Sequence, residues 1–127
     1  MAIVLVVNDD NDLLDIYQEL VVSMGHEPVT RPTITSGPAV IREIGADALI
    51  VDLQSPAEGE MGLRIIEEVR SHPDTSDIPI ILCSGAPEAV EVHSSQLEAW
   101  RVPVVIKPFA LEELETHLRS ALSPAES

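Results

Sequence analysis

Five side chains that could do chemistry each follow a short apolar run, at widely separated points of the sequence. They are Asp9, Asp10, Asp52, Ser84 and Lys107. Carboxylates that meet at one site repel each other unless a cation joins them, and their hard oxygen atoms suit Mg²⁺. Mg²⁺ usually binds through one or two carboxylates together with a phosphate, and aspartate is a known nucleophile toward phosphoryl groups. A lysine and a hydroxyl could hold the oxygens of the transferred group. The set predicts phosphoryl chemistry if the fold brings it together.

The apolar runs that precede these residues alternate with amphipathic stretches. The expected strands are Ile3 to Val7, a weak one around Glu27 to Thr30, Ala48 to Val51, Ile80 to Cys83, and Val104 to Ile106. The expected helices carry Leu13 to Met24, Ala39 to Ile44, Ile65 to Val69, Pro87 to Leu97, and Leu111 to Leu122. Such alternation predicts an α/β fold with a parallel sheet and right-handed crossovers. Because parallel strands end at one common edge, the five side chains are expected to converge there.

The length, the net charge and the cysteine content limit the number of domains, the kinds of binding partner and the cellular location. The 127 residues suit one domain, which we place at residues 1–122, with 123–127 a frayed tail or the start of a linker. A net charge of −15 argues against direct contact with nucleic acid or a membrane surface. The single cysteine, Cys83, fits a reducing compartment, and no apolar stretch reaches membrane-spanning length, so we expect a cytoplasmic protein. Cys83 is expected to pack in the core.

Over essentially its whole length the sequence resembles the receiver domain of bacterial two-component response regulators. The matching segments are Val6-Val7-Asn8-Asp9-Asp10, Leu49-Ile50-Val51-Asp52-Leu53 with Pro56 after it, Ser84-Gly85, and Lys107-Pro108-Phe109. Their order and spacing carry the resemblance, since no single segment is specific. The resemblance implies a flavodoxin-like, doubly wound fold of five parallel strands in the order 2-1-3-4-5, flanked by five helices.

The resemblance also assigns roles to residues. Asp52 corresponds to the phosphoacceptor. Asp9, Asp52 and the backbone carbonyl of Gln54 correspond to ligands of Mg²⁺ (or Mn²⁺), and Asn8 would contact the metal through a water molecule. The phosphoryl-contacting residues are Ser84 and Lys107, the conformational switch involves Ser84 and Val104, and Lys107–Pro108 is expected to be a cis peptide, with Pro108 the cis-proline.

The sequence departs from the family pattern at two of these positions. Asn8 stands where the family usually has the first of two acids, so one negative charge is missing and metal affinity should fall. Val104 replaces the aromatic switch residue, so the usual ring rotation that carries the signal cannot operate. The loop after Asp52 is also slightly longer than usual, with Gly59-Glu60 as the extra residues.

Three functions are therefore considered. The first is a receiver that takes a phosphoryl group on Asp52 from a histidine kinase or phosphotransfer protein, and signals to a downstream protein partner. It would assist only its own phosphorylation and dephosphorylation, so it would not be an enzyme with a separate substrate. The alternative, motivated by Asn8 and Val104, is a degenerate receiver that binds proteins independently of phosphorylation. The third is a small phosphohydrolase that works through an aspartyl phosphate. Against it, Gln54 stands two residues beyond Asp52, where such an enzyme would need an acid to act as general acid.

Overall fold

Of the five strands described, four form where the sequence has short aliphatic, β-branched runs, and the fifth is the weak strand around Glu27 to Thr30. The computed structural model describes residues 2–8, 11–31, 37–53, 56–84, 91–106 and 111–122. Its strands are β1 (Ile3–Val7), β2 (Glu27–Arg31), β3 (Ala48–Leu53), β4 (Ile80–Ser84) and β5 (Val104–Ile106). The side chains at Val4, Leu5 and Val6 of β1, and at Leu49 and Ile50 of β3, are 0% exposed. Continuous apolar runs of this kind favour strands that are covered by helices on both faces.

The strands form one sheet in the order β2-β1-β3-β4-β5, and every neighbouring pair is parallel. This confirms the predicted 2-1-3-4-5 order. The chain moves outward from β1 to β2 and then crosses back to β3, so the order reverses between β1 and β3. Val7 pairs with Val51 across these two strands. Asn8 and Asp52, which come next, therefore sit side by side at the reversal point, where open α/β sheets form their ligand sites.

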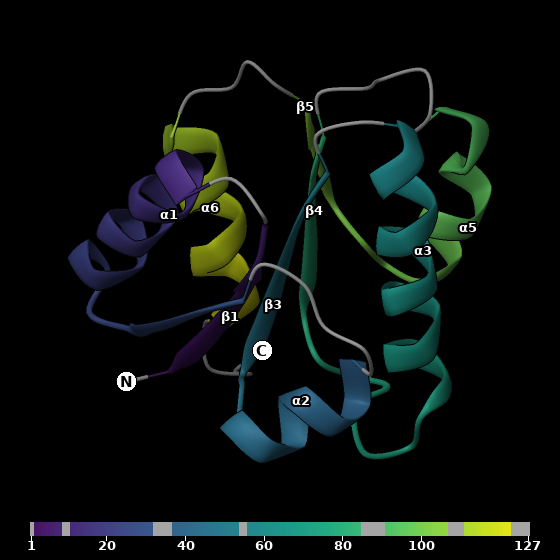
Figure 1. The fold of residues 1–127 in the computed structure, drawn as a ribbon, viewed down its shortest axis with the longest axis horizontal. Coiled ribbons are helices and arrows are strands. Elements are labelled where there is room, and N and C mark those ends of the chain that lie inside the picture. The colour runs from purple at the N-terminus through teal and green to yellow at the C-terminus, as the bar shows by residue number, and fades with distance from the viewer. Residues whose placement is uncertain are drawn as a thin grey trace.

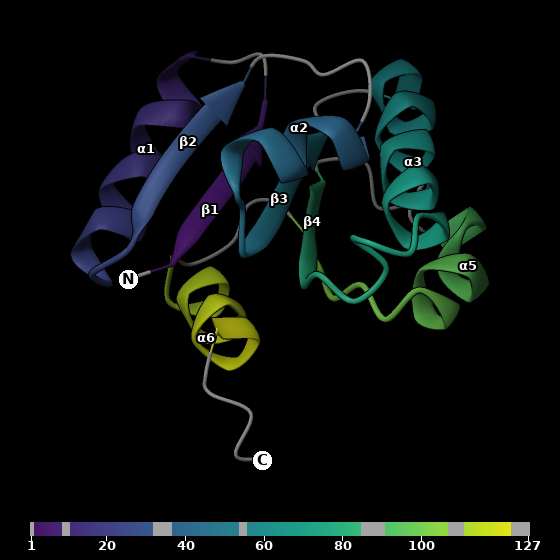
Figure 2. The same ribbon diagram turned by 90° about the horizontal axis from the view of Figure 1, so that it is seen from below.

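Five helices cover the sheet in the described part of the chain. They are α1 (Asn11–Ser23), α2 (Gly37–Ile44), α3 (Pro56–Ser71), α5 (Ser94–Ala99) and α6 (Leu111–Leu122). Helices α1 and α6 lie on one face, and α2, α3 and α5 lie on the other (Figures 1 and 2). None of the helices described is long and apolar enough to cross a membrane.

Several boundaries differ from the sequence-based expectation. The helix expected around Ile65 to Val69 starts earlier, because α3 begins at Pro56, a residue favoured at the first helical position, and it runs to Ser71. Gly59-Glu60 therefore lie in this helix, and the expectation that they extend the loop after Asp52 is wrong.

The helix expected at Pro87 to Leu97 is described as α5, Ser94–Ala99, and residues 85–90 lie outside the described part. It runs past Leu97 because its end is fixed by backbone hydrogen bonds further on, such as that from the amide of Trp100 to the carbonyl of Gln96. Asp52 and Ser84 were expected just beyond their strands, but ladder pairing continues through them, Asp52 with Cys83 and Leu53 with Ser84.

The core consists of two clusters, one on each face of the sheet, because successive side chains of a strand point to opposite faces. The cluster beneath α2, α3 and α5 includes Leu5, Val7, Leu49, Val51, Ile66 and Leu82. The cluster beneath α1 and α6 includes Val4, Val6, Tyr17, Ile50, Cys83, Val105 and Leu118. Both are aliphatic, as the composition predicts, with Tyr17 as the one aromatic side chain among the fully buried residues described. The prediction that Cys83 packs in the core is confirmed, since it is 0% exposed.

Three helices end in a left-handed residue. Gly25 after α1 has φ +85° and Gly45 after α2 has φ +76°. Arg101, after α5, has φ 59°, although it is not a glycine. Here the amide of Val102 donates to the carbonyl of Leu97, and the amide of Arg101 donates to that of Glu98, both at 3.0 Å. These are the two hydrogen bonds of a Schellman motif, which satisfies the last carbonyls of a helix.

Residues 72–79 link α3 to β4 and lie at the amino ends of the strands, which we call the amino edge of the sheet. The guanidinium of Arg70 donates to three backbone carbonyls, those of Trp100 (2.7 Å), Ser76 (3.1 Å) and Ile78 (2.5 Å). Burial, and then the charge of Arg101, lower the pKa of Arg70 from its ordinary value, while Asp77 partly offsets this.

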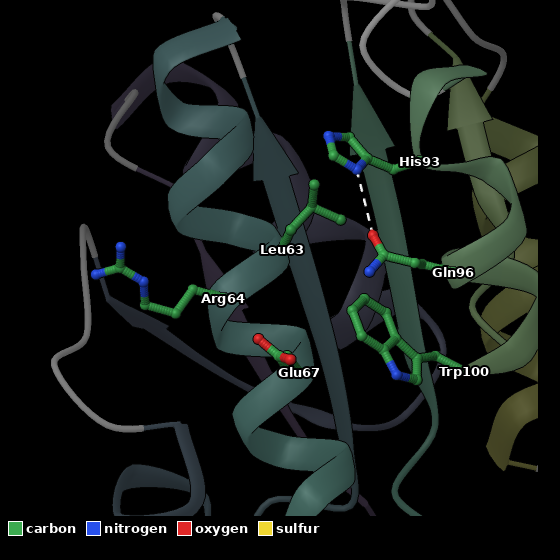
Figure 3. A pocket seen from close by; sticks show the side chains of 6 residues that line it. All are labelled: Leu63, Arg64, Glu67, His93, Gln96 and Trp100. Carbon is green, nitrogen blue, oxygen red and sulfur yellow. Dashed lines mark hydrogen bonds between the residues drawn. The ribbon is translucent and has the colours of Figure 1, made fainter.

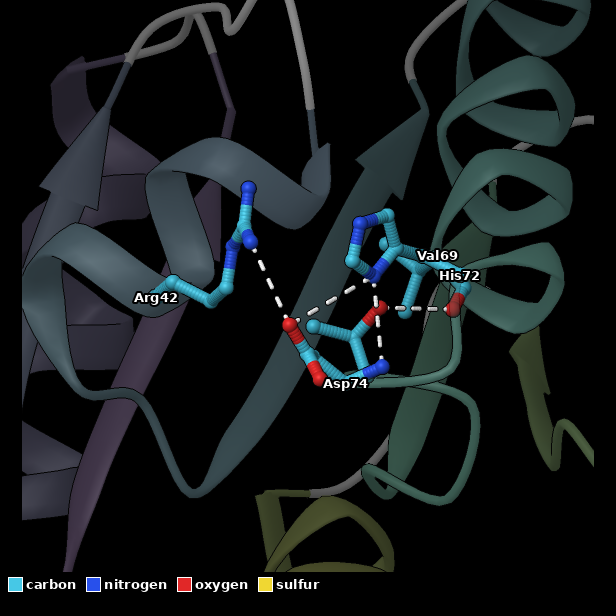
Figure 4. A network of polar contacts seen from close by, with 5 residues as sticks. Arg42, Val69, His72 and Asp74 are labelled. Atoms are coloured by element: carbon cyan, nitrogen blue, oxygen red, sulfur yellow. Dashed lines mark hydrogen bonds and ion pairs between the residues drawn. The ribbon is translucent and has the colours of Figure 1, made fainter.

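A second polar network holds the same linker (Figure 4). The hydroxyl of Thr75, 3% exposed, donates to the carbonyl of Val69 at 2.7 Å. The amide of Asp74 donates to Nδ1 of His72 at 3.2 Å, and the Asp74 carboxylate pairs with Arg42 of α2 at 3.2 Å. The linker is therefore tied to α3, to α2 and, through Arg70, to the end of α5.

Candidate functional site

The structure describes four of the residues that the sequence singles out for the site. Asn8 and Asp52 lie side by side at the carboxyl ends of β1 and β3, Ser84 is the last residue of β4, and Val104 is the first residue of β5. The other residues expected at this edge lie outside the described residues, namely Asp9, Asp10, Gln54, Lys107 and Pro108. Their predicted roles, and the cis peptide at Lys107–Pro108, therefore stay predictions.

Asp52 is a buried carboxylate at the end of the central strand. It is 5% exposed, and the alternation along β3 puts its side chain on the face covered by α1 and α6, like that of Ile50. An ionised carboxylate is costly to bury unless hydrogen bonds or a cation stabilise it. Asp52 is therefore placed where a cation or an electrophile at the sheet edge would be attracted to it.

The hydroxyl of Tyr17, in α1, donates a hydrogen bond to Oδ2 of Asp52. Tyr17 is 1% exposed. Burial is the main cause that raises the pKa of this phenol well above its usual range, followed by the neighbouring Cys83 and Asp52. Its hydroxyl thus remains protonated and able to donate.

The contact between Tyr17 and Asp52 was not predicted from the sequence. The helical spacing places Tyr17 only among the residues that face the core. One signal could have found the contact: a phenol at a core position needs a partner for its hydroxyl, and this chain has one tyrosine and few other aromatics. The buried acid at the nearby strand end is the natural acceptor.

Asn8 is 2% exposed, and its backbone amide donates to the carbonyl of Arg31 at 3.0 Å. This bond extends the β1–β2 ladder by one residue beyond Val7 and fixes the backbone that carries the amide side chain. A neutral amide can be buried here at lower cost than a second carboxylate next to Asp52.

The chemistry of this donor set fits a hard cation. Asn8 and Asp52 offer amide and carboxylate oxygens on adjacent strands, and Mg²⁺ is commonly held by one or two carboxylates with several waters. No cluster of three or more His, Cys, Asp or Glu side chains occurs among the residues described.

Val104 is half-buried and packs against the cluster beneath α2, α3 and α5. Ser84 pairs with Ile106 of β5, two residues along from the pairing of Leu82 with Val104. The ends of β4 and β5 are thus directly coupled through the sheet ladder.

A separate hollow of about 220 Å³ opens between α3 and α5 (Figure 3). Arg64 and Glu67 of α3 line one side, and His93, Gln96 and Trp100 line the other, with His93 Nδ1 3.3 Å from Gln96 Oε1. It lies on the face of the sheet opposite to Tyr17, because Trp100 packs against the other core cluster. Its charges are mixed, so it does not select an ionic ligand of one sign.

Comparison with known proteins gives relatives along nearly the whole chain. The chain is 28% identical to a "Probable transcriptional regulator ycf27" of Pyropia yezoensis over 123 residues, which cover 97% of this chain and 48% of the relative. It is 29% identical to the "Sensory transduction protein RegX3" of Mycobacterium bovis over 125 residues, 96% of this chain and 51% of that protein. The chain thus spans about half the length of these relatives.

Solved structures share the fold. The chemotaxis protein CheY4 of Vibrio cholerae superposes with a TM-score of 0.74 at 23% identity, covering 96% of this chain and 99% of that one. The receiver domain of the sensor histidine kinase PA1611 of Pseudomonas aeruginosa, described with a magnesium ion in its active site cleft, has a TM-score of 0.68 at 19% identity, covering 97% and 98%.

The family model of the response regulator receiver domain matches residues 4–119. That range includes β1 from Val4 onward, the whole of β2 to β5, and the edge where Asn8 and Asp52 meet. The sheet order of the structure agrees with the solved receivers to which it is similar. This chain belongs to the response regulator receiver domain family, whose members act in two-component signalling.

Proposed function

We propose that this receiver accepts a phosphoryl group on Asp52 from a histidine kinase or phosphotransfer protein, with the help of Mg²⁺ (or Mn²⁺). The observation that carries the proposal is the buried carboxylate of Asp52 at the point where the strand order reverses, beside Asn8. The signal would then pass to a downstream protein partner, in the cytoplasm, without direct contact to nucleic acid or membrane. Residues 1–122 would form the functional unit.

The chemistry is one displacement at phosphorus. An oxygen of Asp52 attacks the phosphorus atom, and the P–N bond of the donor's phosphohistidine breaks. The electron pair of that bond goes to the imidazole nitrogen, which takes up a proton, and an acyl phosphate remains on Asp52. Because both the carboxylate and the phosphoryl group are negative, their approach requires positive charge nearby.

Residues of this chain would supply that environment. Asp9, Asp52 and the carbonyl of Gln54 would hold the metal, and Asn8 would hold it through a water molecule. When bound, the metal neutralises charge on the phosphoryl oxygens. Lys107 and the hydroxyl of Ser84 would bind the same oxygens, with the backbone at Pro108 placing the lysine.

Val104 affects the route by which phosphorylation would change the conformation of the rest of the domain. It is packed against the core beneath α2, α3 and α5, and a valine has no ring to turn. The proposed route is therefore a shift of Ser84 at the end of β4, passed to β5 through their ladder pairing. Receivers change output by shifting a two-state equilibrium, so a small backbone shift is sufficient.

A phosphorylation-independent binding module is the second candidate. The specific observation in its favour is the burial of a neutral Asn8 where the family has an acid, which lowers the charge available to a metal. The two functions differ in one measurable property, which is whether Asp52 accepts phosphate.

The test is the intact mass of the protein after incubation with acetyl phosphate and Mg²⁺. We expect a gain of one phosphoryl group in the wild type and in Asp77→Asn, whose exposed carboxylate lies at the opposite edge of the sheet. Asp52→Asn should show no gain. A folded wild type that stays unmodified would instead support the binding module.

A further inference from the structure

The hydroxyl of Tyr17 reaches from α1 to the carboxylate that the site uses. It donates to Oδ2 of Asp52, and both side chains are buried, at 1% and 5% exposure. A hydrogen bond from a neutral donor to a carboxylate is stronger than one between two neutral groups, and low local polarity strengthens it further. Tyr17 therefore stabilises the charge of Asp52 in addition to packing in the core.

The phenol of Tyr17 keeps its proton. The hydroxyl of an unperturbed tyrosine loses its proton only at about pH 10, so this donor is present at neutral pH. Cys83 lies beside Asp52 in the ladder between β3 and β4 and is 0% exposed, so this hydrogen bond is shielded from water. A cation that binds the same carboxylate must therefore compete with a donor that is always present.

We propose that Tyr17 is a positioning residue that competes with the metal ion for the Asp52 carboxylate. This inference rests on the proposed role of Asp52 as metal ligand and phosphoacceptor. The phenol proton offsets part of the negative charge that attracts a cation, and it holds an oxygen that could otherwise turn toward the sheet edge. Tyr17 thus lowers the affinity for the metal, and slows the phosphorylation that depends on it.

This effect adds to that of Asn8. A neutral amide replaces an acid on the neighbouring strand, and the hydroxyl of Tyr17 offsets part of the charge of Asp52. Both features lower the affinity for a divalent cation. Phosphorylation by a small phosphodonor would therefore need a higher Mg²⁺ concentration than it would without these two features.

The test is a titration with Mg²⁺ alone, read by the rise in the unfolding temperature and by calorimetry. Tyr17→Phe removes the hydroxyl and keeps the ring. We expect this variant to bind Mg²⁺ about tenfold more tightly than the wild type, which corresponds to the loss of one charge-assisted hydrogen bond that competes with the metal. Phosphorylation by acetyl phosphate at a fixed, subsaturating Mg²⁺ concentration should be faster by a similar factor.

Val21→Ala is the matched control. Val21 lies one turn further along α1, is 0% exposed and has no polar atom in its side chain. It should lower the stability of the fold yet leave the Mg²⁺ affinity within about twofold of wild type, because it removes no group that donates a hydrogen bond to Asp52. Should Tyr17→Phe fold poorly, Tyr17→Leu also lacks the hydroxyl and should show the same tighter binding.

Unchanged or weaker Mg²⁺ binding in the hydroxyl-free variants would overturn the inference, because weaker binding would mean that Tyr17 orients Asp52 for the metal. The absence of Mg²⁺ binding in both wild type and variants would overturn it as well. The mass experiment on Asp52 is read separately. Tighter Mg²⁺ binding by the variant with no phosphoryl gain would leave the competition between Tyr17 and the metal standing and reject the proposed phosphorylation of Asp52.

Discussion

Each edge of the sheet holds one charged side chain in a set of hydrogen bonds, but Asp52 at the carboxyl edge is buried and Arg70 at the amino edge is half-buried. At the carboxyl edge Asp52 accepts a hydrogen bond from the side chain of Tyr17. At the amino edge Arg70 donates to three backbone carbonyls at 2.5 to 3.1 Å. Backbone carbonyls are held by the fold and cannot rotate away, whereas a side-chain hydroxyl belongs to a single rotatable group.

The charged groups also differ in what they can become. A guanidinium keeps its proton under all ordinary conditions, so Arg70 is a permanent cation. A carboxylate can be protonated, bound by a metal or joined to a phosphoryl group, so the charge of Asp52 can change. The comparison indicates that the amino edge stabilises the fold while the carboxyl edge is left able to react.

Arg70→Ala tests directly whether the hydrogen bonds of Arg70 at the amino edge stabilise the fold. The substitution leaves the carbonyls of Trp100, Ser76 and Ile78 without their donor and removes the connection between α3, the 72–79 linker and the end of α5. We expect the free energy of unfolding to fall by about 3 kcal/mol, the magnitude for loss of a partly buried charged hydrogen-bond network. Urea denaturation measures it.

Arg70→Lys is the matched variant, because it keeps the charge and loses the planar fork that reaches several carbonyls at once. It should be destabilised by an intermediate amount. The Arg70→Ala protein, assayed at a temperature where it is folded, should still gain a phosphoryl group on Asp52 as readily as the wild type. A loss of phosphoryl acceptance comparable with that of Asp52→Asn would show that the two edges are not separate in function.

The amino-acid sequence was sufficient to predict much of the fold and part of the site. The runs at Ile3–Val7 and Ala48–Leu53 are continuous and apolar, which is the pattern of central parallel strands, and their shared edge follows from the topology. Asn8 and Asp52 could therefore be placed together from the sequence alone. The bond between Tyr17 and Asp52 could not, because it joins residues 35 positions apart and depends on the rotation of α1 over the sheet.

The contacts of Arg70 were missed for a different reason. Its acceptors are backbone carbonyls, which every residue has, so no side-chain pattern in the sequence marks them. The left-handed conformation of Arg101 was likewise hidden, since glycine is the usual residue at such a position, as it is at Gly25 and Gly45. Sequence patterns thus predict apolar packing better than they predict main-chain hydrogen bonds.

Arg101→Gly should raise the stability of the amino edge without changing the carboxyl edge. Arg101 has φ 59°, a conformation in which a Cβ atom is unfavourable and glycine is not. We expect the variant to be more stable by about 1 kcal/mol, measured by thermal or urea unfolding. The lost ion pair with Asp77, at 3.5 Å, contributes little because both side chains are largely exposed.

Arg101→Ala separates the backbone effect from the loss of the side chain. It removes the same charge, which lies close enough to Arg70 to lower its pKa, but retains the unfavourable Cβ. Its stability should stay near that of the wild type. If alanine stabilised the protein as much as glycine does, the gain would come from relief of the repulsion between Arg101 and Arg70, and the backbone explanation would be wrong.

Asp74→Ala has the smallest expected effect. It tests how much an exposed ion pair at the amino edge contributes to the free energy of unfolding. Its carboxylate lies 3.2 Å from Arg42, but the two side chains are 59% and 52% exposed (Figure 4). Surface pairs of this kind contribute between zero and about 1 kcal/mol, and salt screens them. We expect a loss of less than about 0.5 kcal/mol, which disappears at high salt.

The expected effect is small because the contacts that hold the linker are made by its backbone carbonyls with side chains that are buried or half-buried. The hydroxyl of Thr75 and the guanidinium of Arg70 bind carbonyls directly, whereas the Asp74 carboxylate faces water and gives up hydration to pair with Arg42. Arg42→Ala should therefore match Asp74→Ala, and the double variant should lose no more than the sum of the two. A coupling above about 1 kcal/mol in this cycle would mean that the exposed pair helps to hold the linker, and that the amino edge depends on charge as the carboxyl edge does.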